Sequence, residues 1–147
     1  MAKTNSKEIR SMVTNDGNIE LSIKTSEIPT PLADEVIIKV EAAPINPSDL
    51  GLLLSFAADI SSISTTGSGD ETKTTIKIHP ALIGAMKPRL GQSMQVGNEG
   101  AGVVIDAGEN VKDLIGKTVG LAGGAMYSQY RCVPATNCLV MDEGIKP

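Results

Sequence analysis

Apolar and polar residues alternate most regularly over residues 36–42, which predicts a β-strand with one buried face. Before it, β-prone runs at 9–14 and 19–25 flank the turn-forming residues 15–18, so a hairpin is predicted there. Further strands are predicted near the end of the chain, at 103–105, 117–121, 127–133 and 138–141. Short β-branched runs separated by Gly, Pro, Asn and Asp indicate a mainly β fold.

One segment has a different pattern and predicts a short helix that begins after Asn46. Asn46 suits the N-cap, Pro47 the first helical position, and Asp49 the third, where a negative charge is favourable. The leucines and the phenylalanine that follow supply its apolar face. The bland interpretation of Asn46 and Asp49 is therefore helix capping.

The middle of the chain is harder to interpret. Residues 60–75 are rich in Ser, Thr and Gly and are predicted to form an exposed loop, followed by a short strand at 74–79. Residues 81–86 are consistent with a helical turn before Pro88.

Three glycines, Gly97, Gly100 and Gly102, precede the β-branched run that starts at Val103. This order predicts a close backbone approach that leads into a buried strand. It does not match a dinucleotide-binding fingerprint, in which the strand comes before the glycines.

Composition excludes several function classes. The chain has 147 residues, 41% hydrophobic and 20% charged, which fits one globular domain. Its net charge of -4 and its three aromatic residues disfavour nucleic-acid binding. No run approaches the roughly 20 apolar residues of a membrane helix, so a cytoplasmic protein with no membrane partner is expected.

Few side chains could bind a metal. Cys132 and Cys138 could pair, but two cysteines in a cytoplasmic chain favour reduced thiols. His79 is the single histidine and has no close ligand partner in the sequence. No metal site is expected.

Three segments together resemble the zinc-independent quinone oxidoreductases of the medium-chain dehydrogenase/reductase family, within the alcohol dehydrogenase superfamily. The segments are DEVIIKVEAAPINPSD at 34–49, GNEGAGVVIDAG at 97–108 and GGAMYSQYRCVP at 123–134, in the order of the family. Each is weak by itself. Residues 138–147 resemble the stretch that precedes the nucleotide-binding domain in this family.

The resemblance implies a GroES-like fold, a partly open β-barrel with a few short helices, over residues 1–147. Residues 55–94 are longer than the matching connection of the family and are interpreted as an insertion. A solvated loop, a lid over the cleft, and a contact in a homodimer are the alternatives for it. The Rossmann domain that holds NADP(H) in complete family members has no counterpart here, so this chain is expected to bind no cofactor.

The zinc-dependent branch of the superfamily has a Cys and a His where this chain has Asn46 and Asn98. Because two of the three ligands of a catalytic zinc are replaced, the resemblance implies a reaction without zinc. A tyrosine that the family often places shortly after Asp49 is also absent, since Gly51 and two leucines follow.

The candidate catalytic residues are Asn46 and Asp49, and the Asn46 amide is expected to hydrogen-bond either the substrate carbonyl or the nicotinamide side. Asn98, Glu99 and Tyr127 are candidates for the substrate cleft. The structural alternatives are a buried Glu99 carboxylate that satisfies backbone donors, and a Tyr127 ring that packs with its hydroxyl at the surface.

Two hypotheses for the function remain, and they belong to different classes of protein. One is the substrate-side domain of an NADPH-dependent oxidoreductase that reduces quinones or activated alkenes and carbonyls, with a small-molecule substrate and no turnover by this chain alone. The other is a free-standing GroES-like structural or interaction module without catalysis.

Overall fold

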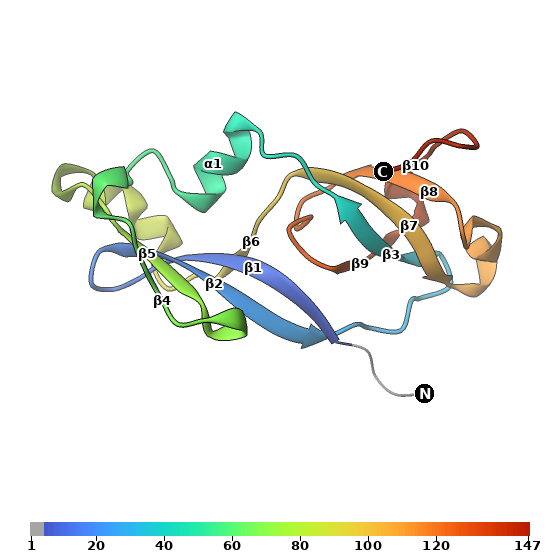
Figure 1. Cartoon of the computed structure of the whole chain (residues 1–147), viewed down its shortest axis with the longest axis horizontal. Helices are drawn as coiled ribbons and strands as arrows, with labels where there is room; N and C mark the ends of the chain where they lie inside the picture. The colour runs from blue at the N-terminus through green and yellow to red at the C-terminus, as the bar shows by residue number, and fades with distance from the viewer. Residues whose placement is uncertain (1–4) are drawn as a thin grey trace. The chain divides into compact units, whose positions relative to one another are not determined.

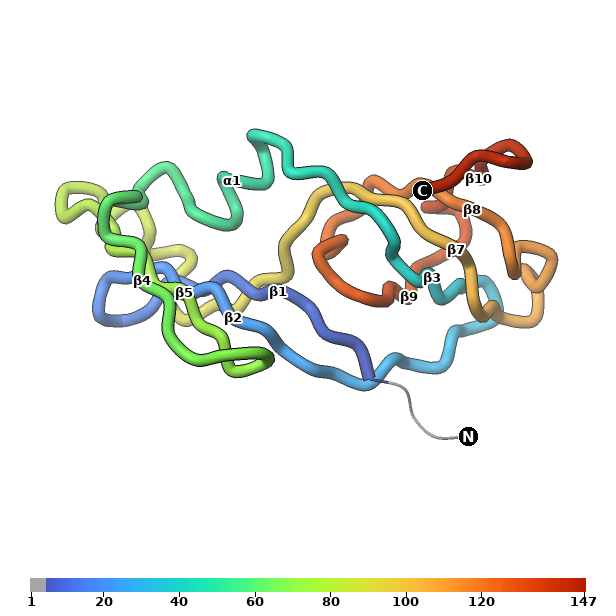
Figure 2. The backbone as a smooth tube through the Cα atoms, in the orientation of Figure 1, coloured from blue at the N-terminus to red at the C-terminus, as the bar shows by residue number. Residues whose placement is uncertain are grey.

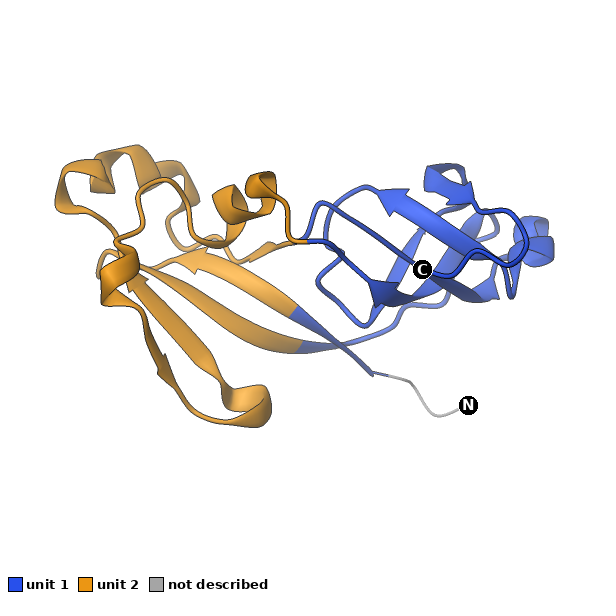
Figure 3. Cartoon of the chain, turned by 45° about the horizontal axis from the view of Figure 1, so that its top comes forward, with its two compact units in different colours: residues 1–8, 25–44, 97–147 blue, residues 9–24, 45–96 orange. Residues whose placement is uncertain are grey.

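The computed structural model describes residues 5–147, which divide into two compact units (Figure 3). The first unit contains the chain up to Glu8, Thr25–Pro44 and Gly97–Pro147. The second unit contains Ile9–Lys24 and Ile45–Val96. Each unit has its own cluster of buried apolar side chains.

The described residues form mainly β-strands with a few short helices (Figure 1). The strands are β1 (Asn5–Val13), β2 (Asn18–Glu27), β3 (Glu35–Ala42), β4 (Ser64–Thr66), β5 (Lys73–Lys77), β6 (Met94–Gln95), β7 (Glu99–Ala107), β8 (Thr118–Ala122), β9 (Tyr130–Pro134) and β10 (Cys138–Val140). The helix α1 spans Pro47–Leu53, and 3-10 turns span Ile60–Ser62, Gly69–Glu71, Pro80–Arg89, Glu109–Leu114 and Ala135–Asn137.

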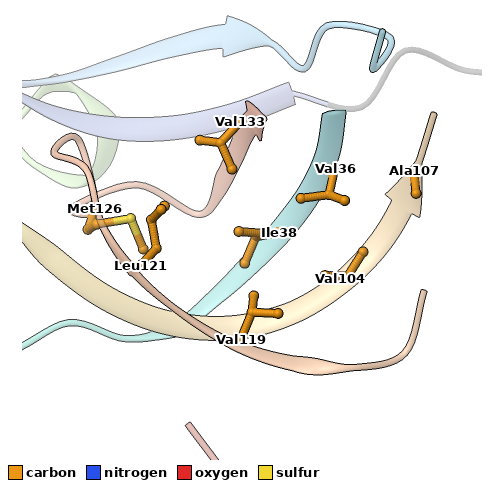
Figure 4. Close-up of a cluster of buried hydrophobic side chains, with 8 residues drawn as sticks. All are labelled: Val36, Ile38, Val104, Ala107, Val119, Leu121, Met126 and Val133. Atoms are coloured by element: carbon orange, nitrogen blue, oxygen red, sulfur yellow. The ribbon is translucent and has the colours of Figure 1, made fainter. Parts of the chain in front are cut away.

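The first unit is built on an antiparallel, curled sheet in the order β10-β8-β7-β3-β9. The predicted alternation in β3 places Val36 and Ile38 in the core, where Ile38 lies opposite Val104 of β7. Figure 4 shows the apolar side chains of β3, β7, β8 and β9 gathered on one side of this sheet. Together with the short helices, this curled half-barrel confirms the predicted mainly β, GroES-like fold.

Close backbone contact between β7 and β3 explains the predicted role of the glycines. A Cβ atom at Gly102 would lie 2.0 Å from the carbonyl oxygen of Lys39, and one at Gly100 would lie 2.7 Å from that of Ala42. No side chain fits at these distances. Gly100 and Gly102 therefore serve strand pairing.

The second sheet has the order β4-β5-β2-β1-β6, and the predicted hairpin forms its centre (Figure 2). Ile19 of β2 lies opposite Ile76 of β5. The buried cluster of the second unit consists of Val13, Ile19, Ala57, Ile78 and Met86. Val13 and Ile19 come from β1 and β2, whereas the other three residues lie outside the strands. The sheet alone therefore does not form this core.

Two sequence predictions need correction. The expected loop at 60–75 contains the strand β4, which pairs with β5 and carries a 2.9 Å hydrogen bond between the Thr65 and Thr74 hydroxyls. The expected strand at 127–133 begins only at Tyr130. Just before it, the Gln129 N–H donates to the Lys7 carbonyl rather than to a strand of the curled sheet.

Candidate functional site

The first candidate residues lie at the start of α1 in the second unit, as the sequence predicts. Asn46 is the N-cap residue, and Oδ2 of Asp49 accepts a 2.8 Å hydrogen bond from its backbone N–H. The Asp49 side chain is fully buried, whereas Asn46 is half-buried. Asp49 therefore acts inside the protein to fix the helix start, and Asn46 is the member of the pair that solvent reaches.

The end of α1 is held by a residue that sequence reasoning missed. One guanidinium nitrogen of Arg89 donates to the Leu52 carbonyl and to the Ser11 hydroxyl, both at 3.0 Å. The Ser11 hydroxyl in turn donates to the Leu53 carbonyl at 3.3 Å. Burial lowers the pKa of Arg89 below its usual value. No local signal in the sequence could connect Arg89 with a helix that ends thirty-six residues earlier.

In the first unit, Asn98 and Glu99 lie at the start of β7. Asn98 is half-buried, and its carbonyl oxygen accepts a 3.1 Å hydrogen bond from the Gly124 N–H. Glu99 is exposed. The interpretation of Glu99 as a buried carboxylate is wrong, because the strand begins at this residue and its side chain lies outside the core.

Tyr127 is placed by two contacts within the first unit. Its hydroxyl donates to the Pro44 carbonyl at 2.9 Å. Its ring covers Gly97, where an added Cβ would lie 2.6 Å from ring atom Cδ1, and Gly97 has a φ of 91° that favours glycine. Tyr127 thus fixes the turn that enters β7, in a half-buried position.

A pocket of about 490 Å³ lies in the first unit, next to the start of β7. Glu99 is the one charged residue in its lining, and Asn137, which the sequence did not single out, adds an amide. The lining consists of Ala42, Pro44, Glu99, Gly100, Ala101, Gly120, Leu121, Ala122, Asn137, Leu139 and Met141. A mostly apolar pocket with two polar groups is the usual form of a small-molecule site.

The candidate residues thus fall into two groups. Asn98, Glu99 and Tyr127 belong to the first unit, where Glu99 is the one of the three that lines the pocket. Asn46 and Asp49 belong to the second unit. Within each unit the predicted residues are close in the fold. The backbone of Asn46 is hydrogen-bonded to Asp49, and the Tyr127 ring contacts Gly97, the residue before Asn98.

Other reactive side chains lie outside these groups. The Cys132 thiol donates to Oε2 of Glu35 at 3.5 Å, and burial together with this carboxylate raises the pKa of Cys132 to about 11. Both cysteines are free thiols. Within residues 5–147, no group of three or more His, Cys, Asp and Glu side chains is placed to hold a metal ion. None of the helices in that range is long and apolar enough to cross a membrane.

The curled antiparallel sheet, the short helices and the glycine contacts define a GroES-like domain. Residues 32–143 match the family of alcohol dehydrogenase GroES-like domains, so the chain belongs to this family. This domain occurs in medium-chain dehydrogenases and reductases. No curated protein matches the chain significantly.

Solved structures agree with this fold. A protein of Bacillus thuringiensis named as an NADPH:quinone reductase matches with a TM-score of 0.60 and 21% identity over 97% of this chain and 35% of its own. A similarly named protein of Mesorhizobium loti gives 0.57 and 20%, over 99% and 39%. An enoyl thioester reductase of Candida tropicalis gives 0.59 and 19%, over 95% and 34%. The chain spans about a third of the length of these proteins.

Proposed function

We propose that this chain is the substrate-side domain of an NADPH-dependent reductase that acts on quinones or on activated alkenes and carbonyls without a catalytic zinc. The observation that carries the proposal is the membership in the GroES-like domain family together with the start of α1, where the half-buried Asn46 is fixed by the buried Asp49. A carboxamide can donate a hydrogen bond to a carbonyl oxygen. We assign this role to Asn46 and a positioning role to Asp49.

The absence of zinc is supported by the chemistry of the side chains. Asn46 and Asn98 stand where the zinc-dependent branch of the family has Cys and His, and neutral carboxamides are poor zinc ligands. A substrate carbonyl would then depend on hydrogen-bond donors rather than on a Lewis acid.

Gly100 and Gly102 do not fit NADPH. Both lie inside β7, which is paired with β3 on one side and with β8 on the other, so their N–H groups belong to the sheet and do not form a loop at a helix start that could hold a pyrophosphate. In this proposal NADPH is held by a part of the reductase outside this domain, and the residues described here contribute contacts with the substrate.

Kinetics with the natural gene product that contains this domain test the proposal. We expect NADPH oxidation with quinones or enones that persists after exhaustive treatment with a zinc chelator. Asn46→Ala should lower kcat/KM by about tenfold or more, because a hydrogen bond to the developing oxyanion is lost, and the NADPH Kd should stay unchanged. Asn46→Gln serves as the matched control that keeps the carboxamide.

The isolated chain provides the counter-test. It should neither bind nor oxidise NADPH, and turnover by the isolated chain would contradict the proposed division of roles. A stable oligomer by light scattering, combined with no reductase activity in any product of the gene, would support the alternative of a structural module.

A further inference from the structure

The turn after α1 has an unusual backbone. Ser55 has a φ of 62°, which is uncommon for a residue with a side chain, and it is buried. Three hydrogen bonds hold it: its N–H donates to the Leu50 carbonyl at 3.1 Å, its hydroxyl donates to the Met86 sulfur at 3.2 Å, and the Ala57 N–H donates to that hydroxyl at 3.2 Å. Strain of this kind persists where surrounding contacts enforce it, and it occurs often at binding sites.

The two residues that follow this turn differ in burial. Ala57 enters the core and is 1% exposed, whereas Phe56 is 75% exposed. Phe56 is the single phenylalanine of the chain, and an aromatic ring of this kind is normally a large contributor to a core. The hydrogen-bonded turn at Ser55 therefore directs Ala57 into the core and leaves Phe56 at the surface.

Beside Phe56 lies a second pocket, of about 460 Å³, which we call the α1 pocket. It is lined by Pro47, Leu50, Gly51, Leu54, Ser55, Phe56, Ala58 and Ile60. No charged residue is in this lining, and the hydroxyl of its single polar side chain is already bonded to Met86. Its volume is within the range of small-ligand sites.

We propose that the α1 pocket binds the alkyl or acyl chain of the substrate. The proposal rests on the function proposed above, since Pro47 in the lining directly follows Asn46, the residue assigned to the carbonyl. A substrate whose carbonyl bonds to Asn46 would therefore extend an apolar chain along α1 towards Phe56. The lining offers a charged substituent no charged side chain as a partner, so it favours apolar substituents.

A chain-length series tests the pocket with the isolated chain. We suggest NMR titration of Leu and Ile methyl groups with 2-pentanone, 2-heptanone and 2-nonanone, and with 1-alkanols of matched length. Each added methylene should lower the Kd by up to about fourfold, the ratio that corresponds to complete burial of one CH₂ group. The shifts should be concentrated at Leu50, Leu54 and Ile60, and a Kd independent of chain length would overturn the proposal.

Variants separate the pocket from general hydrophobicity. Phe56→Ala should raise the Kd of 2-nonanone about tenfold and that of 2-pentanone less. Leu32→Ala, which removes another exposed apolar side chain in the first unit, should change neither. Ser55→Gly accepts the positive φ but loses the hydroxyl bonds, so it should weaken binding while the circular dichroism spectrum stays unchanged. Equal effects of Phe56→Ala and Leu32→Ala would contradict the proposal.

The Asn46→Ala variant, titrated with the same alkanones, separates this proposal from the function on which it rests. If this variant leaves the Kd values and their dependence on chain length unchanged, the α1 pocket is supported and the carbonyl contact of Asn46 fails. If it weakens alkanone binding while the Kd of the unchanged chain shows no dependence on length, the pocket is disproved and the Asn46 contact stands.

Discussion

The two units are stabilised in different ways. In the first unit, strand pairing and a continuous apolar cluster account for the fold: Val36, Ile38, Val104 and Val119 are all at most 1% exposed, and glycines let β7 and β3 approach. In the second unit, the helix and the turns are held by single side chains that reach the backbone far along the sequence, such as Arg89 to Leu52. The stabilisation of the first unit is spread over many apolar contacts, whereas that of the helix and turns in the second unit depends on a few polar groups.

This difference matters for function. A positive φ at a residue other than glycine occurs in both units, at Ala125 in the first and at Ser55 in the second, but only the turn at Ser55 is followed by an exposed aromatic side chain, Phe56. A regular sheet tolerates little variation in side-chain volume, whereas a turn supported by hydrogen bonds can present a chosen side chain to solvent. We therefore expect the two units to respond differently to mutation.

The largest effects should come from cavities in the two cores. Ile38→Ala in the first unit and Ile19→Ala in the second should each lower the free energy of unfolding by about 2–5 kcal/mol, because both side chains are completely buried. Urea unfolding followed by circular dichroism measures this loss. If each unit unfolds by itself, each variant moves one of two transitions, and a single shared transition would show that the units unfold together.

The next comparison uses two glycines. Gly102→Ala should cost about 1–3 kcal/mol or more, since its Cβ would meet the Lys39 carbonyl oxygen. Gly51→Ala in α1 should instead stabilise the protein by about 0.5–1 kcal/mol, because no atom lies within 4 Å of the new Cβ and alanine favours the helix. Thermal unfolding of both variants gives the sign, and equal signs would refute the proposed contrast.

Removal of the buried Asp49 carboxylate at the start of α1 should have a smaller effect. Asp49→Ala leaves the Asn46 N–H without its 2.8 Å acceptor and should cost about 1–2 kcal/mol. Asp49→Asn keeps an acceptor oxygen and should recover most of this loss. Chemical unfolding at pH 7 measures both, and an Asn variant as unstable as the Ala variant would mean that the negative charge, not the hydrogen bond, is required.

The smallest effect concerns Cys132. Burial and the Glu35 carboxylate raise the pKa of its thiol from 9.0 to about 11, so the folded state favours the protonated form. This contribution to stability is complete below about pH 9 and is lost as the pH rises towards 11. In a Cys138→Ser variant, alkylation of Cys132 by iodoacetamide should therefore reach half of its maximal rate near pH 11. A plateau by pH 9 would show that the thiol is not shielded.

The sequence predicted the strongly patterned elements correctly. Alternation identified β3, the turn residues identified the hairpin of β1 and β2, and Asn46, Pro47 and Asp49 identified the start of α1. These signals are local, since each depends on residues that lie within one strand or one turn. Gly100 and Gly102 were also informative, because a missing Cβ implies a close neighbour, although both lie inside β7 and not before the strand as predicted.

By itself, the sequence determined the mainly β fold, the small number of His and Cys side chains that could bind a metal, and the choice of candidate residues. Only the tertiary structure decided that Glu99 is exposed, that β4 pairs with β5, that Arg89 supports α1, and that Ser55 turns Phe56 outward. The reason is physical: pairing, burial and hydrogen bonds between distant residues are properties of the folded arrangement, and no short stretch of sequence contains both partners.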